Sequence, residues 1–210
     1  WPDEQLPSHA EVWVEAALDH RRLLLNVPPG HAKTSIMATR FTLWQLACDR
    51  NTNVLIVSKT TKLGEKIVRA IAQEMEHNLA LLEDFGNFKP PQGTRWSVGL
   101  GELMVDAKDP GTGDLSVLIR GSGQAILGFR ADWIVVDDPT DRGISRSEAE
   151  RNSQREWFVG EVETRLKPDG RIFCIGQRVH VDDLYGWLAK KTNEETGESV
   201  WTQIETPAVL

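Results

Sequence analysis

Four short, mainly apolar runs recur along the chain, and the segments between them carry apolar residues at helical spacing. The runs fall at 23–27, 54–57, 134–137 and 172–175, and the helical pattern is clearest over 34–48 and 63–79. Apolar strands of this kind are buried on both faces, and helices between them imply a parallel sheet covered on both sides. The sequence therefore predicts an α/β fold in which these four runs are neighbouring central strands.

The length and composition of the chain fit one globular domain. It has 210 residues, of which 40% are hydrophobic and 26% are charged. We expect a single domain over 1–210. Within it, the Gly- and Pro-rich stretch 90–123 is expected to form a hairpin or antiparallel extension, and 181–210 a C-terminal subdomain or linker.

Charge and cysteine content narrow the function classes. The net charge of −7 argues against a surface that is basic throughout, although a local basic patch is enough to bind nucleic acid. No apolar run approaches the roughly 20 residues of a membrane-spanning helix, and Trp1 does not begin a signal peptide. Cys48 and Cys174 are isolated, which favours reduced core residues of a cytosolic protein over a disulfide or zinc site.

The turn after the first apolar run has residue types that bind phosphate. It leads directly into the helical pattern, and a helix N-terminus presents free N–H groups to an anion. A lysine at this place reaches the terminal phosphates, and the hydroxyl that follows binds Mg²⁺. We therefore predict a phosphate-binding loop made of Pro29, Gly30, His31, Ala32, Lys33, Thr34 and Ser35.

The loop departs from the pattern G-x-x-x-x-G-K-[ST] at both glycines, where this chain has Val27 and Ala32. On the pattern alone, a helix start with a surface lysine is an equal alternative. A left-handed backbone costs an L-residue about 1–2 kcal/mol. We therefore expect a negative φ at Ala32, with Gly30 supplying any positive φ that the loop needs.

Two carboxylates, Asp137 and Asp138, follow the third apolar run. Ligands of open α/β sheets bind at the carboxyl ends of the strands, which is where this pair is expected. Asp137 would orient Mg²⁺ or its water, and Asp138 would polarise an attacking water. Alone, Asp-Asp-Pro reads more readily as a polar turn. Together with Lys33 and Thr34 after the first strand, it favours a nucleotide site.

Two further groups of polar residues have simpler explanations. A basic stripe steps by three, four and three along one helical face, and comprises Lys59, Lys62, Lys66 and Arg69. It could follow DNA phosphates, but the solvated face of an amphipathic helix is the favoured interpretation. His180, Asp182 and Asp183 do not have a chelating spacing, and acidic residues at a helix start are favoured by the helix dipole.

Three ordered segments resemble the large terminase subunits of tailed bacteriophages. Segment 28–34 is similar to their Pro-Pro-Arg-His-Gly-Lys-Ser phosphate loop, and 128–139 to the stretch with an Arg shortly before the acidic strand. Segment 175–184 is similar to their coupling segment, usually Gly-Thr-Arg-Trp-His followed by Asp-Leu. The resemblance covers almost the whole chain, including His9, Trp13 and 204–208. The departures are Gly30 for Arg, Ala32 for Gly, Gln177 for Thr and Val179 for Trp.

The resemblance implies a three-layer P-loop ATPase of the ASCE or RecA-like class that binds ATP and Mg²⁺. Such motors drive double-stranded DNA into a procapsid, as a homo-oligomeric ring docked on a portal protein and working with a small terminase subunit. They act in the host cytoplasm. Their C-terminal nuclease domain has no counterpart in this chain, so we expect the motor domain alone.

The resemblance also implies roles for single residues. Lys33 would contact phosphate, Asp138 would activate water, and Gln177 would sense the γ-phosphate. Arg130 would act in trans as an arginine finger, with Arg120 as second candidate; the alternative is that Arg130 pairs with an acid such as Asp132. Two other functions stay open: a helicase-like nucleic-acid-dependent ATPase, and a degenerate nucleotide-binding assembly module that does not hydrolyse ATP.

Overall fold

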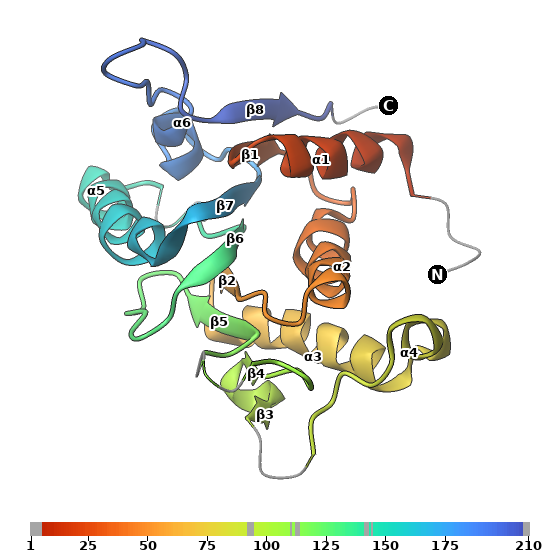
Figure 1. Ribbon diagram of the computed structural model, residues 1–210. Helices are drawn as coiled ribbons and strands as arrows, with labels where there is room; N and C mark the ends of the chain where they lie inside the picture. The colour runs from red at the N-terminus through yellow and green to blue at the C-terminus, as the bar shows by residue number, and fades with distance from the viewer. Residues whose placement is uncertain are drawn as a thin grey trace.

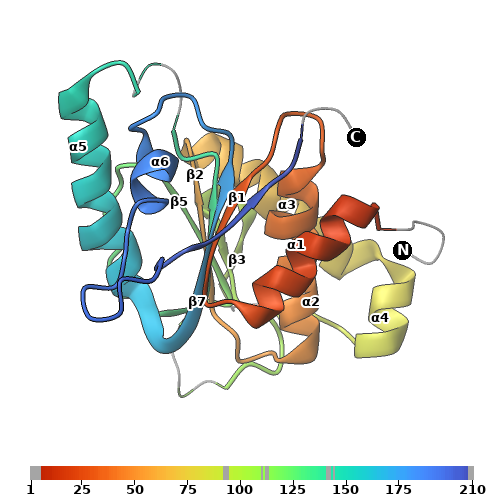
Figure 2. The same cartoon turned by 90° about the horizontal axis from the view of Figure 1, so that it is seen from above.

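The computed structural model describes residues 6–91, 95–109, 111, 114–140, 143 and 145–207. It is an α/β protein with an eight-stranded, mainly parallel sheet. The strands are β1 (Arg22–Asn26), β2 (Val54–Ser58), β3 (Trp96–Ser97), β4 (Glu102–Leu103), β5 (Val117–Gly121), β6 (Ala131–Asp137), β7 (Leu166–Gly176) and β8 (Thr202–Glu205). Figures 1 and 2 show helices on both faces of this sheet.

The helical segments divide between the two faces. α1, α2, α3 and α4 lie on one side of the sheet, and α5 and α6 lie on the other (Figure 2). Their bounds are α1 (Ser8–Asp19), η1 (Thr34–Arg40), α2 (Phe41–Cys48), α3 (Thr61–His77), α4 (Leu79–Phe85), η2 (Val98–Leu100), α5 (Glu148–Trp157), η4 (Phe158–Val162), η5 (Glu163–Arg165) and α6 (Leu184–Leu188). None of the helices in the described part of the chain has the length and apolar character that crossing a membrane requires.

The four predicted central strands are neighbours, as expected. The strand order is β3-β4-β5-β2-β6-β7-β1-β8, and the pairs within β2-β6-β7-β1 are all parallel. Successive side chains point to opposite faces, so each strand contributes to two apolar cores. In β1, Leu23 and Leu25 face the core under α1, α2 and α3, while Leu24 faces the core under α6.

The antiparallel part of the sheet is confined to one edge. β4 pairs antiparallel with both β3 and β5, whereas β5 returns to the parallel direction beside β2. At the other edge, β8 pairs parallel with β1. The final segment, expected as a subdomain or linker, therefore supplies a strand of the same sheet.

Three local features were not predicted from the sequence. The first predicted helix begins as the π-helix η1 and becomes α-helical only at Phe41. Helix α5 is capped by Ser147, whose hydroxyl accepts from the Glu150 N–H. Ser145, two residues earlier, is buried, and its hydroxyl lies 3.3 Å from that of Thr140.

Candidate functional site

The carboxyl ends of three adjacent strands bring the predicted site residues to one edge of the sheet. The loop leading to Lys33 follows β1, Asp137 is the last residue of β6, and Gln177 follows β7. Because β6, β7 and β1 are parallel neighbours, these strand ends lie together although they are up to 150 residues apart in sequence.

The backbone of the loop differs from the prediction at one residue. Gly30 has φ 87°, as expected, but Ala32 has φ 54°, so the expected negative φ at Ala32 is wrong. The Ala32 carbonyl accepts the Ile36 N–H at 2.9 Å, a bond that starts the helical segment. Ala32 thus has the left-handed conformation that a glycine would adopt without strain at this turn into η1. For alanine this conformation costs about 1–2 kcal/mol.

An aromatic wall supports the loop from the side of α1. His31 lies edge-on to His9, with ring centroids 5.5 Å apart, and His9 in turn packs on Trp13 at 4.9 Å. The buried Trp13 indole donates to the Thr206 hydroxyl at 3.1 Å. The loop is therefore held between the first helix and the segment after β8.

The hydroxyl of Thr34 meets the carboxylate of Asp137. Thr34 is the first residue of η1, and its Oγ1 lies 2.9 Å from each of the two Asp137 oxygens. Burial raises the pKa of Asp137 to about 6, and the neighbouring Asp138 charge adds to this rise. The Thr34 hydrogen bond and the Lys33 charge act in the opposite direction and lower the Asp137 pKa.

The sequence neighbours of Thr34 and Asp137, namely Lys33 and Asp138, also lie in contact. Lys33 Nζ lies 2.9 Å from Asp138 Oδ2; the lysine side chain is 11% exposed and the aspartate side chain 40%. Asp138 has φ 44°, a left-handed conformation that Asp tolerates better than most residues. This turn directs the Asp138 carboxylate toward the loop after β1.

The position of Asp138 is fixed by β7 and α6. Its backbone N–H and the buried Tyr185 hydroxyl both donate to the Ile175 carbonyl, at 2.8 Å each. A Cβ on Gly176 would collide with the Tyr185 hydroxyl and the Asp138 carboxylate. Sequence analysis missed Tyr185 and Gly176, because no local pattern indicates that they pack against an aspartate on another strand.

A cavity of about 560 Å³ opens beside these side chains. Its lining includes Thr34, Asp137, Asp138 and Gln177, so the structure brings Gln177 to the same cavity as the acidic pair. The cavity continues along η1 and α3, where Ser35, Thr39, Lys59, Leu63, Lys66, Ile67 and Ala70 line it. It thus extends from the carboxyl edge into a groove between two helical segments.

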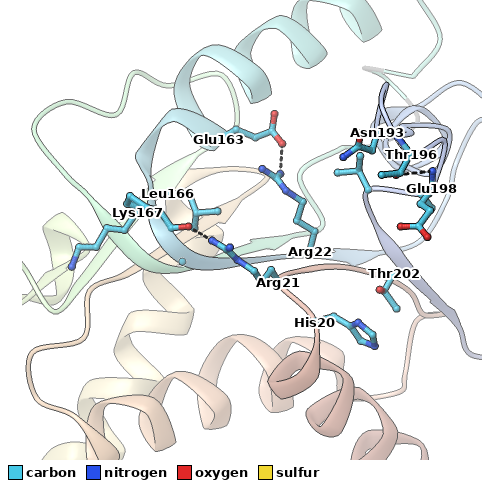
Figure 3. Close-up of a pocket in the computed structure, with 14 residues that line it drawn as sticks. His20, Arg21, Arg22, Glu163, Leu166, Lys167, Asn193, Thr196, Glu198 and Thr202 are labelled. Atoms are coloured by element: carbon cyan, nitrogen blue, oxygen red, sulfur yellow. Dashed lines mark hydrogen bonds and ion pairs between the residues drawn. The ribbon is translucent and has the colours of Figure 1, made fainter.

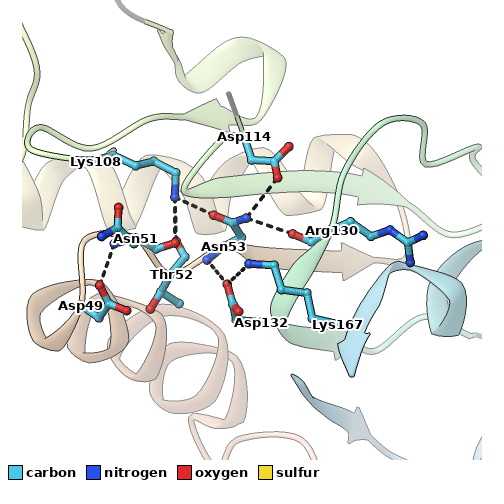
Figure 4. Close-up of polar contacts among 9 residues, drawn as sticks. All are labelled: Asp49, Asn51, Thr52, Asn53, Lys108, Asp114, Arg130, Asp132 and Lys167. Atoms are coloured by element: carbon cyan, nitrogen blue, oxygen red, sulfur yellow. Dashed lines mark hydrogen bonds and ion pairs between the residues drawn. The ribbon is translucent and has the colours of Figure 1, made fainter. Parts of the chain in front are cut away.

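The two candidate arginines lie outside this cavity. Arg130 precedes β6 and Asp137 ends it, so about 20 Å of strand separates them. The Arg130 guanidinium donates to the Thr164 carbonyl at 2.7 Å. The backbone carbonyl of Arg130 accepts from the Asn53 side-chain amide (Figure 4). Asp132, the acid expected as its alternative partner, pairs instead with Lys167 at 2.8 Å. Arg120 lies near the end of β5, 3.8 Å from Glu102.

The polar residues after β7 have structural roles. Asp183 is fully buried, and its carboxylate accepts the N–H groups of Val179, His180 and Gly186. Asp182 forms an exposed ion pair with Lys190. Among the described residues, no group of three or more His, Cys, Asp and Glu side chains is arranged to hold a metal ion.

A larger cavity, of about 670 Å³, lies at the opposite end of the strands, where β1, β7 and β8 begin (Figure 3). Its cations are bound to neighbouring groups: Arg22 pairs with Glu163 at 2.5 Å, and Arg21 donates to the Pro168 carbonyl. The carboxyl-edge cavity is smaller, but it contains a buried carboxylate with a raised pKa. We therefore place the candidate site at the carboxyl edge.

The donor set at this edge fits a hard divalent cation. The Thr34 hydroxyl and the Asp137 carboxylate are oxygen donors, and Asp137 is a buried acid whose pKa is raised mainly by burial. Mg²⁺ is usually held by one or two such protein oxygens together with water and substrate phosphates. No known family model matches the chain, and no curated protein does either.

Proposed function

We propose that this chain is a P-loop ATPase, and that it serves as the motor domain of a large terminase subunit. The observation that carries the proposal is the paired contact at the carboxyl edge: Thr34 on Asp137, and Lys33 on Asp138. A loop lysine and hydroxyl facing two strand-end acids is the arrangement that P-loop enzymes use for phosphoryl transfer to water.

In this proposal the loop binds the phosphate chain of ATP. N–H groups at the start of η1 and the Lys33 ammonium would bind phosphate oxygens. Thr34 and Asp137 would hold Mg²⁺, which neutralises charge on the phosphates when it is bound. Phosphate competes with Asp138 for Lys33, so ATP binding would release the Asp138 carboxylate from its ion pair.

Asp138 would then act on the attacking water. Its carboxylate is partly exposed and lines the cavity together with Gln177, whose amide can contact the γ-phosphate. Asp is one methylene shorter than the Glu common at this place, so the water must bind close to the end of β6. Arg130 enters the proposal only in trans, because it precedes the strand that Asp138 follows and so lies at the other end of that strand.

The DNA-packaging role is proposed from the ordered motifs and from the position of their residues. In this proposal the chain acts as part of a ring of identical subunits on double-stranded DNA, together with a portal protein and a small terminase subunit. Its ligands are ATP and Mg²⁺, and its location is the host cytoplasm. The second candidate is a nucleotide-binding module that does not hydrolyse ATP. The observation that favours this second candidate is Ala32, a strained residue at a position where phosphate-binding loops usually have glycine.

Two measurements separate these functions: the rate of ATP hydrolysis and the affinity for ATP. Both would be made on the wild-type chain, Lys33→Ala and Lys190→Ala. Lys190 is a matched control, because its ion pair with Asp182 is exposed and lies away from the cavity. We expect Lys33→Ala to abolish hydrolysis and weaken ATP binding, and Lys190→Ala to change neither. Binding without hydrolysis in the wild type, at concentrations that allow assembly, would favour the module. An absence of ATP binding would end the proposal.

A further inference from the structure

We infer that Lys66 is a phosphate-contacting residue that acts in cis, at the γ-phosphate end of the candidate site. This inference rests on the proposed function and adds a cation that the motifs do not contain. Lys66 belongs to α3, which follows β2 and is outside the loop, the acidic strand and the segment after β7.

The first support is position. Lys66 lines the same cavity as Thr34, Asp137, Asp138 and Gln177. With the phosphate chain on the loop, its terminal group faces the strand-end acids, and α3 forms the far wall of that space. A four-carbon stem gives the lysine ammonium enough reach to follow a phosphate across such a cavity.

The second support is the surroundings of the Lys66 stem. Leu63, Ile67 and Ala70 line the cavity on the same helix, and Ile67 is buried in the core. Lys66 is exposed, so its apolar stem can lie along this wall while its ammonium stays in the open cavity.

The third support is the availability of the cation. Lys33 is paired with Asp138, and Arg120 lies beside Glu102. Arg130 is at the other end of β6. Within the part of the chain that the structure describes, no acidic side chain forms an ion pair with Lys66. It is therefore free to meet an incoming anion.

The structure also divides the basic stripe of α3. Lys66 lines the cavity, as does Lys59 ahead of the helix, whereas Lys62 and Arg69 do not; all four residues are exposed. The favoured interpretation of the stripe, a solvated helix face, remains suitable for Lys62 and Arg69. Lys62 is thus a matched control: it has the same residue type, lies one turn away on the same helix and carries the same charge.

The test compares Lys66→Ala, Lys66→Arg and Lys62→Ala with the wild-type chain. Calorimetry would measure the affinities for ADP and for a nonhydrolysable ATP analogue, each with Mg²⁺, and a phosphate-release assay would give kcat and KM. We expect Lys66→Ala to lower the affinity for the ATP analogue about tenfold, while the affinity for ADP stays within about twofold of the wild-type value. We expect kcat to fall about 10- to 100-fold, the range for one lost charge-stabilising donor or somewhat less. Lys66→Arg should retain most of the wild-type affinity for the ATP analogue and most of the wild-type kcat. Lys62→Ala should behave like the wild type.

Three results would overturn the inference. Equal behaviour of Lys66→Ala and Lys62→Ala would return Lys66 to the solvated face. An equal loss of ADP and ATP-analogue affinity in Lys66→Ala would show that it acts on the whole nucleotide or on folding. Normal nucleotide affinity and basal rate, with only DNA-stimulated hydrolysis reduced in both variants, would assign the stripe to DNA. A wild-type chain that binds neither nucleotide would instead refute the proposed function, and this inference with it.

Discussion

The Lys33 ammonium lies 2.9 Å from the Asp138 carboxylate, so the cation expected to meet phosphate and the acid expected to meet water neutralise each other. The two residues follow different strands, and both contribute to one edge of the sheet. Any anion that binds the loop must compete with Asp138 for Lys33. Phosphate binding at the loop and release of the Asp138 carboxylate would therefore be linked through this single ion pair.

Replacing Asp138 by Asn should separate binding from hydrolysis. The amide cannot act as a base, so we expect kcat to fall at least about 100-fold. The ion pair with Lys33 is lost as well, so ATP affinity should stay the same or rise a few-fold. Asp182→Asn, which removes an acid from an exposed ion pair, is the control. Near-normal turnover by Asp138→Asn would show that another group activates the water.

Replacing Asp137 by Asn should stabilise the protein in metal-free buffer above pH 6. The folded protein retains the Asp137 proton up to about pH 6, whereas the ordinary pKa of an aspartate, as in the unfolded chain, is 3.8. The folded state therefore binds more protons between these values, and the free energy of unfolding falls as pH rises through this window. Above pH 6 we expect Asn to add about 1–3 kcal/mol, and the gain should vanish near pH 4.

Urea unfolding of both proteins with EDTA at pH 4, 6 and 8 measures this difference. A gain that does not depend on pH would contradict the assignment of the effect to Asp137 ionisation. Since Mg²⁺ binds the ionised carboxylate, the affinity of the wild type for Mg²⁺ and ATP together should also decline as pH falls below 6.

Replacing Ala32 by Gly should relieve backbone strain at the loop. Its φ of 54° is costly for alanine but not for glycine, and the gain is partly offset by the greater freedom of glycine in the unfolded chain. We expect about 0.5–1 kcal/mol of added stability, with ATP binding retained. Ala107→Gly is a comparison, because Ala107 has φ 59° outside the site. Thermal melts would measure both variants, and destabilisation by Ala32→Gly would refute the strain assignment.

Arg130 should act only across a subunit interface. We expect Arg130→Ala to bind ATP normally, since its guanidinium contacts the Thr164 carbonyl at the far end of β6. Mixing Arg130→Ala with Lys33→Ala should restore part of the ATPase rate, because some sites then combine an intact Lys33 with a neighbour's Arg130. If the two inactive proteins co-assemble and the mixture stays inactive, Arg130 has the structural role of anchoring the turn before β6.

The apolar runs predicted the central strands correctly because strands buried on both faces have a strong sequence signal. No described residue of helix α4 is fully buried, and Leu81 and Leu82 are only partly buried against the core, so this helix contributes little to the pattern of buried residues. Helix α1 could have been found, since its buried residues Ala10, Trp13 and Ala17 step by three and four. The π-helical form of η1 depends on hydrogen-bond register, which side-chain spacing does not encode.

The candidate site was predictable where residue type determines the chemistry, as for Lys33, Thr34 and Asp137. It was not predictable where tertiary packing overrides local preference, as in the positive φ of Ala32. The distance from Arg130 to the acidic pair follows from simple geometry. Seven residues of extended strand are about 20 Å long, so a short sequence spacing here means a large separation in space.

The Trp13–Thr206 hydrogen bond joins residues 193 positions apart and supports the wall beside the phosphate loop. During synthesis, α1, the loop and η1 are made long before β8. The loop then lacks the strand beside β1 and the partner of Trp13. A nascent chain should therefore gain the proposed nucleotide affinity late, only when the β8 segment docks. The order of translation thus sets the moment at which the site becomes complete.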